Sequence, residues 1–485
     1  MLLLFYQVIP GMALQKIIGG NKMKHKNLLA LLLVLVMIVS SLAGCSSKKE
    51  TEETKADETK TEETKTEDTK TEDTKTEEAT SDGGWEYKEA SITLSIDKDV
   101  SLAGLEAVVA LAKEKLDITV EIETRVSGAE GDAMVKTRLA SGDMTDICGY
   151  NSGSLLNALN PTEYFMDISS EEFIARLDDT YKKTVTVGDA TFGVPFSSSQ
   201  AGAILYSKPM YEKYGLEVPK TWSEFIANCE VLKTAEETAI IGTYADSWTA
   251  QVLYLGDNYN VLAAEPDFAK EFEAGTAKYA TTPAGLASFA KLAETNKYYN
   301  EDYLAASYDD GCDMIANGEG AHWIMLTQAL SNIYGLYGEL VNDIGVFAIP
   351  GDDANNSGLT VWMPTSLYGN KASDKQEDIL RFMEFYVSDE ALDAYTSAVL
   401  PDGPYCIKGY ELPDNSYEAV VNDMQAYFDA GKTAVALEFL TAVKGANCPA
   451  ICQEVASGQT NAEEAAASYD DDCLKQAVQL GLDWK

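Results

Sequence analysis

The chain of 485 residues is 46% apolar and 9% aromatic, which is ample for globular cores and, at this length, favours two lobes over one. Its formal net charge is −41, and this excess of acids excludes a nucleic acid partner, because phosphate neutralisation needs basic side chains. The only histidines are His25 and His322, which argues against imidazole metal sites and against a Ser-His-Asp triad.

The first functional element is an export signal that begins at Met23. Residues 24–26 (Lys-His-Lys) form a positive n-region, and an apolar run follows over residues 28–39. This run is too short for a comfortable membrane span and has the length of a signal peptide core. Residues 42–45 (Leu-Ala-Gly-Cys) have the pattern of a bacterial lipobox, so we expect cleavage before Cys45 and lipidation of its thiol. The alternative is a short membrane anchor that is never cleaved.

A spacer follows the signal. Residues 1–22 are interpreted as an upstream extension, with a start at Met1 or Met23 left open, and residues 23–44 as the lipoprotein signal peptide. Residues 45–84 then hold the lipidated cysteine and a low-complexity segment rich in Thr, Glu and Lys. Its five-residue repeat matches neither helix nor strand and buries nothing apolar, so we expect a disordered tether. Two acyl chains suffice for stable anchoring of such a protein to a membrane.

Alternating strand and helix patterns begin at residue 91. Residues 91–97 and 118–122 alternate as strands do, whereas residues 102–116 and 134–140 carry apolar side chains at helical spacing. A short buried strand is expected at residues 146–148. The order strand, helix, strand, helix, strand indicates a parallel α/β sheet with right-handed crossovers.

Helix starts are predicted where a hydroxyl residue stands three positions before a carboxylate or an amide, since the two side chains satisfy each other's free backbone donors. Four positions have this form, at Ser169, Thr221, Ser373 and Thr460. Thr282-Pro283 adds a proline at a first helical position.

Seven cysteines follow Cys45, an odd number with irregular spacings that does not indicate a disulfide framework. Cys448 and Cys452 either pair or share one helix face. We expect buried free thiols here, and neither a metal site nor a cofactor.

A series of short segments carries a family resemblance along nearly all of residues 88–485. They lie at residues 139–143, 146–147, 192–195, 205–208, 214–216, 219–225, 314–320, 344–350 and 385–390. No single segment is specific, but in this order, behind a lipobox, the chain resembles the bacterial extracellular solute-binding proteins of the maltose-binding-like group (family 1).

The resemblance implies an α/β, two-lobed periplasmic-binding-protein-like fold of type II, with a ligand cleft between lobes joined by crossing strands. Lobe one would comprise residues 88–194 with 358–402, and lobe two residues 195–357 with 403–485. It implies a protein without enzymatic activity that captures a sugar or oligosaccharide and delivers it to the permease subunits of an ABC importer. We expect a monomer, lipid-anchored to the outer face of the cell membrane of a Gram-positive bacterium.

The candidate ligand residues combine aromatic rings for the C–H faces of a sugar with polar groups for its hydroxyls. They stand near a predicted crossing (195–199, 351–358 or 400–404), beside a cleft turn, or at the carboxyl end of a parallel strand, where open α/β sheets bind ligands. The candidates are Tyr150, Asn151, Ser198, Tyr244, Asp246, Trp248, Trp323, Trp362, Asp402 and Tyr405.

Each candidate has a structural alternative. Trp323 is favoured among the tryptophans because it follows a glycine turn that lines the cleft in the family, but any tryptophan is often a core residue. Asp246 is the favoured acceptor for sugar hydroxyls, with a helix N-cap as its other role.

Two other functions stay open. The same fold could bind a peptide, a polyamine or another polar solute, since the acidic surface suits a cation. A surface glycan hydrolase or lyase would act through paired carboxylates, and no motif singles out such a pair.

Overall fold

The structure is a computed structural model that describes residues 79–80, 84–98, 100–126 and 128–484. The predicted signal peptide and Cys45 lie outside the described residues. β1 (Ala79–Thr80) pairs antiparallel with β2 (Glu86–Tyr87), so a short ladder occupies the last part of the predicted tether. Within the described ranges, no helix is both long and apolar enough to cross a membrane.

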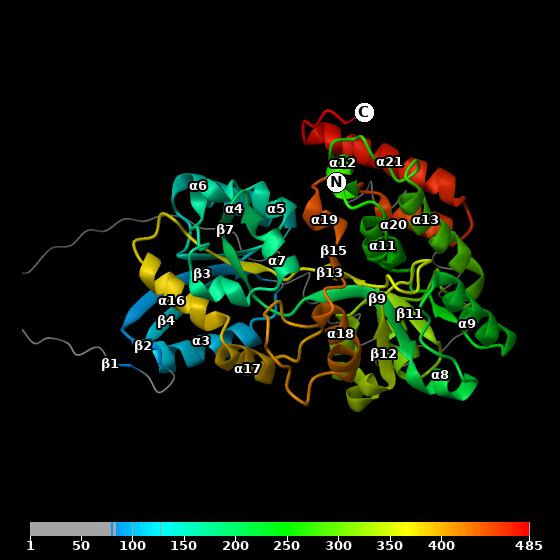
Figure 1. The fold of residues 1–485 in the computed structure, drawn as a ribbon, viewed down its shortest axis with the longest axis horizontal. Helices are drawn as coiled ribbons and strands as arrows, with labels where there is room; N and C mark the ends of the chain where they lie inside the picture. Colours follow the sequence, from blue (N-terminus) through cyan, green and yellow to red (C-terminus); the bar gives the residue numbers. More distant parts are fainter. Residues whose placement is uncertain (1–78, 81–83, 99, 127, 485) are drawn as a thin grey trace, which may run out of the picture. The chain divides into compact units, whose positions relative to one another are not determined.

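The first sheet is built around a parallel unit. Its elements are β3 (Ala90–Asp97), α3 (Ala103–Leu116), β4 (Ile118–Arg125), α4 (Gly128–Ser141), β5 (Ile147–Tyr150), β8 (Gly193–Pro195) and β14 (Ser366–Gly369). The strand order is β4-β3-β5-β14-β8 (Figure 1). β3 pairs in parallel with both β4 and β5, which confirms the α/β unit expected from the sequence. β14 runs antiparallel to β5 and β8.

Short elements and two helices complete this part of the chain. They are α5 (Ser154–Asn157), α6 (Pro161–Tyr164), η1 (Glu172–Arg176), α7 (Asp179–Thr184), β6 (Thr186–Val187), β7 (Ala190–Thr191), α16 (Gln376–Tyr386) and α17 (Asp389–Ala398). α17 packs on α3, and α16 contacts both α3 and β3. α3 buries Leu105, Val108 and Leu116, which recur at helical spacing and therefore share one face.

The second sheet has six strands, of which the long strand β9 is central. They are β9 (Gln200–Ser207), β10 (Ile240–Ile241), β11 (His322–Leu326), β12 (Ile344–Phe347), β13 (Leu359–Trp362) and β15 (Thr433–Val435). The order is β10-β11-β9-β13-β15, and β12 also pairs with β9. β9 is antiparallel to β11, β12 and β13, whereas β10–β11 and β13–β15 are parallel pairs.

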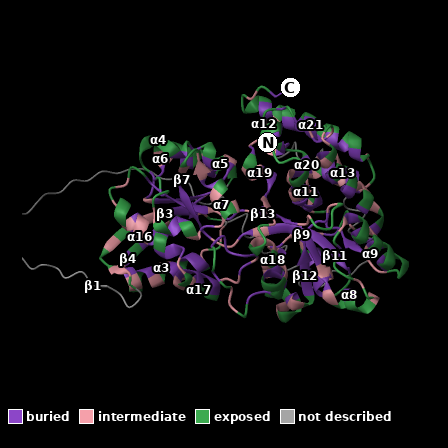
Figure 2. Cartoon of the chain, in the orientation of Figure 1, coloured by how far each residue is buried: buried purple, intermediate pink, exposed green. Residues whose placement is uncertain are grey.

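Many short helices surround this second sheet. They are α8 (Lys208–Tyr214), α9 (Trp222–Thr234), η2 (Ser247–Gln251), α10 (Val252–Gly256), α11 (Asn258–Ala264), α12 (Phe268–Glu273), α13 (Pro283–Thr295), η3 (Asn296–Tyr298), α14 (Tyr308–Ala316), α15 (Ala329–Tyr337), η4 (Gly338–Asp343), η5 (Ala419–Met424), α18 (Gln425–Asp429), α19 (Leu437–Leu440), α20 (Cys448–Ala456) and α21 (Ala462–Gln479). α13, α20 and α21 pack on one another. Figure 2 shows strands β9 and β11 buried, while the surrounding helices present exposed faces.

Two of the predicted helix starts are confirmed. Thr221 precedes α9, and its side chain and that of Glu224 each accept a hydrogen bond from the other residue's backbone nitrogen. Thr282 precedes α13, which has Pro283 in its first turn. Such caps matter because the first turn of a helix leaves backbone donors without partners.

The other three predicted starts are wrong, because the hydroxyl has another partner or the cap shifts by one residue. Ser169 Oγ and Ser373 Oγ each donate to a nearby aspartate instead. At α21 the N-cap is Asn461 rather than Thr460, and its side-chain oxygen accepts from a backbone nitrogen of the first turn.

The chain passes between the sheets at three places. The first passage joins β8 to β9, close to the expected crossing. The second joins β13 to β14 at residues 363–365, later than the expected 351–358, because β13 pairs with β9 and β15. The third follows α17, where Tyr405 forms an isolated bridge to Ser198. The limits of the two lobes stay a prediction.

Candidate functional site

Three aromatic rings from three separate elements form a tilted stack beside the second sheet, with interplanar angles of 46° and 38°. Tyr308, the first residue of α14, has its ring centroid 5.3 Å from that of Trp323 in β11. The same tyrosine ring lies 5.5 Å from that of Trp248 in η2. Trp323 is 1% exposed, whereas Trp248 and Tyr308 are half-buried. The accessible aromatic surface therefore belongs to Trp248 and Tyr308, with Trp323 beneath them.

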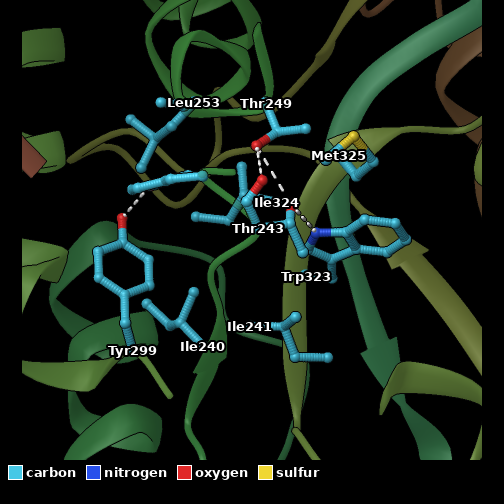
Figure 3. Close-up of a pocket in the computed structure, with 11 residues that line it drawn as sticks. Ile240, Ile241, Thr243, Thr249, Leu253, Tyr299, Trp323, Ile324 and Met325 are labelled. Carbon is cyan, nitrogen blue, oxygen red and sulfur yellow. Dashed lines mark hydrogen bonds between the residues drawn. The ribbon is translucent and has the colours of Figure 1, made fainter. Parts of the chain in front are cut away.

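Trp323 is buried because its strand and the helix above it leave no gap. A Cβ atom at Gly311 of α14 would lie only 2.5 Å from Cζ2 of the Trp323 ring, so this glycine lets the helix approach the indole. The indole Nε1 donates to Thr243 Oγ1 at 3.4 Å (Figure 3). The tryptophan favoured from the sequence thus occupies the core in this structure.

A small internal cavity borders the buried face of Trp323 (Figure 3). Thr243, Tyr244, Tyr299 and Met325 are among the side chains that line it. Its volume of about 10 Å³ is at the limit for one water molecule, so it has no room for a solute. Tyr244 is 7% exposed, and its hydroxyl donates to Tyr299 Oη at 2.7 Å. The predicted ligand residue Tyr244 therefore belongs to the packing around this cavity.

Asp246 contacts the first residue of α14. Its Oδ2 accepts a hydrogen bond from the backbone nitrogen of Tyr308 at 2.7 Å. A carboxylate at this position also complements the positive end of the helix dipole. Asp246 precedes η2 without capping it through its side chain, and the N-cap of α14 is Ser307, so the N-cap alternative is not confirmed. Its contact with α14 instead holds the backbone of Tyr308.

Asp402 lies in the third passage between the sheets, near the same tyrosine. Its negative charge is one of the causes that raise the pKa of Tyr308, together with the larger effect of burial. Burial also raises the pKa of Asp402 itself to about 7, an effect opposed by Ser331 of α15. Within the described part of the chain, Oδ1 of Asp402 is buried and has no hydrogen-bond partner.

Tyr405 and Ser198 adjoin Asp402. Tyr405 is 6% exposed, and its hydroxyl lies 2.9 Å from Thr396 Oγ1. Burial raises its pKa, and the charge of Asp402 adds to this. Four of the predicted residues interact with Tyr308, and two more are linked to this group through Asp402 and Tyr405. They are Ser198, Asp246, Trp248, Trp323, Asp402 and Tyr405.

Tyr308 itself was not predicted from the sequence. The signal that could have found it is a capping box one residue earlier, in which Ser307 and Asp310 satisfy each other's backbone nitrogens. This box places Tyr308 at the first helical position. The residue then lies beside the segment 244–248, which carries three of the predicted ligand residues. Its hydroxyl donates to Asn332 Oδ1 of α15 at 3.2 Å.

The remaining candidates, Tyr150, Asn151 and Trp362, make a second set of contacts that involves both sheets. Tyr150 ends β5, is 3% exposed, and donates from its hydroxyl to Asp132 Oδ1 at 2.7 Å. The guanidinium of Arg125 lies 5.9 Å from its ring centroid. The backbone oxygen of Asn151, an exposed residue, accepts a hydrogen bond from the hydroxyl of Tyr368.

Trp362 is the last residue of β13 in the second sheet. Its indole covers Gly202 of β9, where a Cβ atom would lie 2.7 Å from the ring. The indole Nε1 donates to Glu438 Oε1. The backbone oxygen of Glu438 accepts from Ser154 Oγ of α5 at 2.8 Å, so this segment touches both the second sheet and the helix that follows Asn151.

The described residues offer few groups for metal or thiol chemistry. The seven cysteines among them are buried and free. Cys448 and Cys452 share one face of α20, with their Sγ atoms 4.0 Å apart. Among the residues with described positions, His, Cys, Asp and Glu do not gather in threes that could hold a metal ion.

Known proteins provide an independent comparison. Residues 99–393 match the family described as bacterial extracellular solute-binding protein. The multiple sugar-binding protein of Streptococcus mutans serotype c is 23% identical over 300 residues, which are 59% of this chain and 68% of that protein.

Solved structures share the fold. The apo-form of RafE from Streptococcus pneumoniae has a TM-score of 0.67 and 18% identity, and the match covers 81% of this chain and 98% of that one. RafE in complex with raffinose has a TM-score of 0.61 and 21% identity, with 79% and 99% covered. The two-lobed periplasmic-binding-protein-like fold expected from the sequence is confirmed. By the family match over residues 99–393, the chain is a member of the bacterial extracellular solute-binding proteins.

Proposed function

We propose that this protein captures a sugar or oligosaccharide outside the cell and delivers it to an ABC importer. The observation that carries the proposal is the half-buried pair of rings at Trp248 and Tyr308, flanked by the carboxylates of Asp246 and Asp402. Flat rings cover the C–H faces of a sugar, and carboxylates accept hydrogen bonds from its hydroxyls. The named sugar specificity of the S. mutans relative and the raffinose bound to RafE support the same ligand class.

The roles of individual residues follow from their places. Trp248 and Tyr308 form the ligand platform, Trp323 supports it from beneath, and Asp402 accepts ligand hydroxyls. Tyr150 and Asn151, at the carboxyl end of a parallel strand, and Trp362 contribute from the second set of contacts. Ligand binding then shifts an equilibrium between open and closed arrangements of the two proposed lobes.

The cellular setting is part of the proposal. The lipobox supports anchoring through Cys45 on the outer face of the membrane of a Gram-positive bacterium. The permease subunits are separate chains, and the protein acts as a monomer without turnover of its ligand. Family membership supports a binding protein over a hydrolase or lyase, because the family is defined by solute binding.

A thermal-shift panel tests the proposal directly. Raffinose, stachyose, galactose and chitin oligosaccharides form one arm, and spermidine with a lysine-rich peptide forms the other. A ligand at about a hundredfold excess over its Kd stabilises the folded state by about 2.7 kcal/mol, which gives a clear rise in Tm. We expect a rise with at least one sugar and none with the amines. A rise with the amines alone would overturn the sugar proposal and establish the alternative ligand class.

A further inference from the structure

Asp402 leaves one carboxylate oxygen without a partner. Within the described part of the chain, Oδ1 is buried and accepts no hydrogen bond. Buried polar atoms are almost always paired, and an unpaired one reduces the stability of the folded state. A ligand that donates a hydrogen bond to Oδ1 would explain why this oxygen has no partner within the protein.

Among the described residues, no cation contributes to the pKa shift of Asp402. The titratable side chains that interact with it are Tyr308 of α14, Tyr395 of α17, and the loop residues Tyr405 and Tyr417. Burial raises the pKa of each tyrosine, so all four are neutral near pH 7. Ser331 of α15 is the polar group that favours the ionised form of Asp402, and it does not cancel the effect of burial.

We propose that Asp402 is a specificity-determining residue of the sugar site, whose ionised carboxylate accepts hydrogen bonds from ligand hydroxyls, so that binding releases a proton from this residue. This inference rests on the proposed function. The ionised carboxylate only accepts hydrogen bonds, so a ligand hydroxyl that donates to Oδ1 favours this form. A ligand that presents only ether or carbonyl oxygens at this point pairs with the protonated carboxyl instead and releases no proton on binding.

Ligand binding and ionisation of Asp402 should favour each other. Burial raises the pKa of Asp402 to about 7, so near neutral pH about half of the empty protein carries the proton. Hydroxyl donors stabilise the ionised form and lower this pKa in the complex. Binding at pH 7 therefore releases about half a proton, and the apparent affinity is about tenfold weaker at pH 6 than at pH 8.

Calorimetric titration tests this with raffinose and the other sugars of the panel as probes. Titrations at pH 7 in phosphate and in Tris, which differ in ionisation enthalpy, give the number of protons released. We expect about half a proton for the wild-type protein. Asp402→Asn should release none, bind at least about tenfold more weakly and lose the pH dependence, because an amide offers one acceptor and does not ionise.

Asp423→Asn is the matched control. Asp423 is half-buried and its pKa is also raised by burial, but its Oδ2 accepts from the backbone nitrogen of Val346 in β12. This variant should keep both proton release and affinity. Sugar binding without proton release, or with full affinity in Asp402→Asn, would overturn the role of Asp402 and leave the proposed function standing. If none of the sugars binds the wild-type protein, both proposals fail.

Discussion

Asp246 and Tyr308 are joined by a hydrogen bond in which Oδ2 of the aspartate accepts from the backbone nitrogen of the tyrosine at 2.7 Å. The two residues are far apart in the sequence, and this bond adds to the Ser307–Asp310 capping box that starts α14. Because Tyr308 is the first residue of the helix, its ring direction depends on that start. Asp246 therefore acts on the aromatic stack through the backbone of the helix.

Replacing Asp246 tests this dependence. Asp246→Ala removes the acceptor and a helix-stabilising charge, so we expect unfolding free energy to fall by about 1–2 kcal/mol. The affinity for the panel sugar should fall as well, since the Tyr308 ring loses its fixed position. Asp246→Asn keeps an oxygen acceptor and should retain most of both. Urea unfolding and tryptophan fluorescence titration measure the two effects, and equal losses in the two variants would contradict a positioning role.

Substitutions of the two tryptophans in the aromatic stack should differ in their effects on ligand affinity and on the free energy of unfolding. Trp323 is 1% exposed, so Trp323→Ala should reduce the unfolding free energy by about 3–5 kcal/mol through the cavity that it leaves. Trp248 is half-buried, so Trp248→Ala should change stability by less than about 1 kcal/mol. Its affinity for the panel sugar should fall about tenfold, because a platform ring is lost.

Urea unfolding and affinity titration of the two variants provide the comparison, with Trp222→Phe as a control. Trp222 is buried in α9, outside the stack, and donates from Nε1 to Glu294. A Trp248→Ala protein that binds the sugar normally would remove this ring from the proposed site. Normal stability in Trp323→Ala would contradict the burial of that ring.

The regular parts of the fold were predictable because their causes are local. The pattern of β3, α3 and β4 repeats every two or every three to four residues, and the sequence alone carries that period. The cap at Thr221 likewise depends on residues three positions apart. By contrast, Ser373 donates to Asp146, which also accepts from Thr93 Oγ1, and these partners are distant in sequence. No local pattern could indicate that this hydroxyl was already engaged.

The aromatic stack likewise combines features that the local sequence predicts with features that depend on distant contacts. The sequence placed Trp248 and Trp323 near the expected cleft, but exposure depends on which helix covers the strand. α14 covers Trp323 and carries Tyr308 over it, and this packing involves residues from η2, α14 and β11. The continuous apolar run over residues 323–326 is typical of a strand buried on both faces and was the available sign of a core position.

His322 should make stability depend on pH. Its side chain is 0% exposed, and burial lowers its pKa to about 4 from the ordinary value of 6.5. Nε2 lies 2.7 Å from Tyr211 Oη and Nδ1 lies 2.7 Å from the oxygen of Ala239, so the neutral ring is held on both sides. Above pH 6.5 the ring is neutral in both the folded and the unfolded chain, and its contribution is fully present.

Below pH 6.5 the unfolded chain binds a proton that the folded chain does not, so the contribution of His322 is lost progressively as the pH falls to about 4. The expected loss is about 3 kcal/mol. Asp402 acts in the opposite direction, since its pKa of about 7 makes the folded state more stable as pH falls below that value. Urea unfolding from pH 7.5 to pH 4.5 should therefore be compared among the wild type, His322→Gln and Asp402→Asn. Stability relative to wild type should rise for His322→Gln as the pH falls and decline for Asp402→Asn, and parallel curves for all three proteins would contradict both assignments.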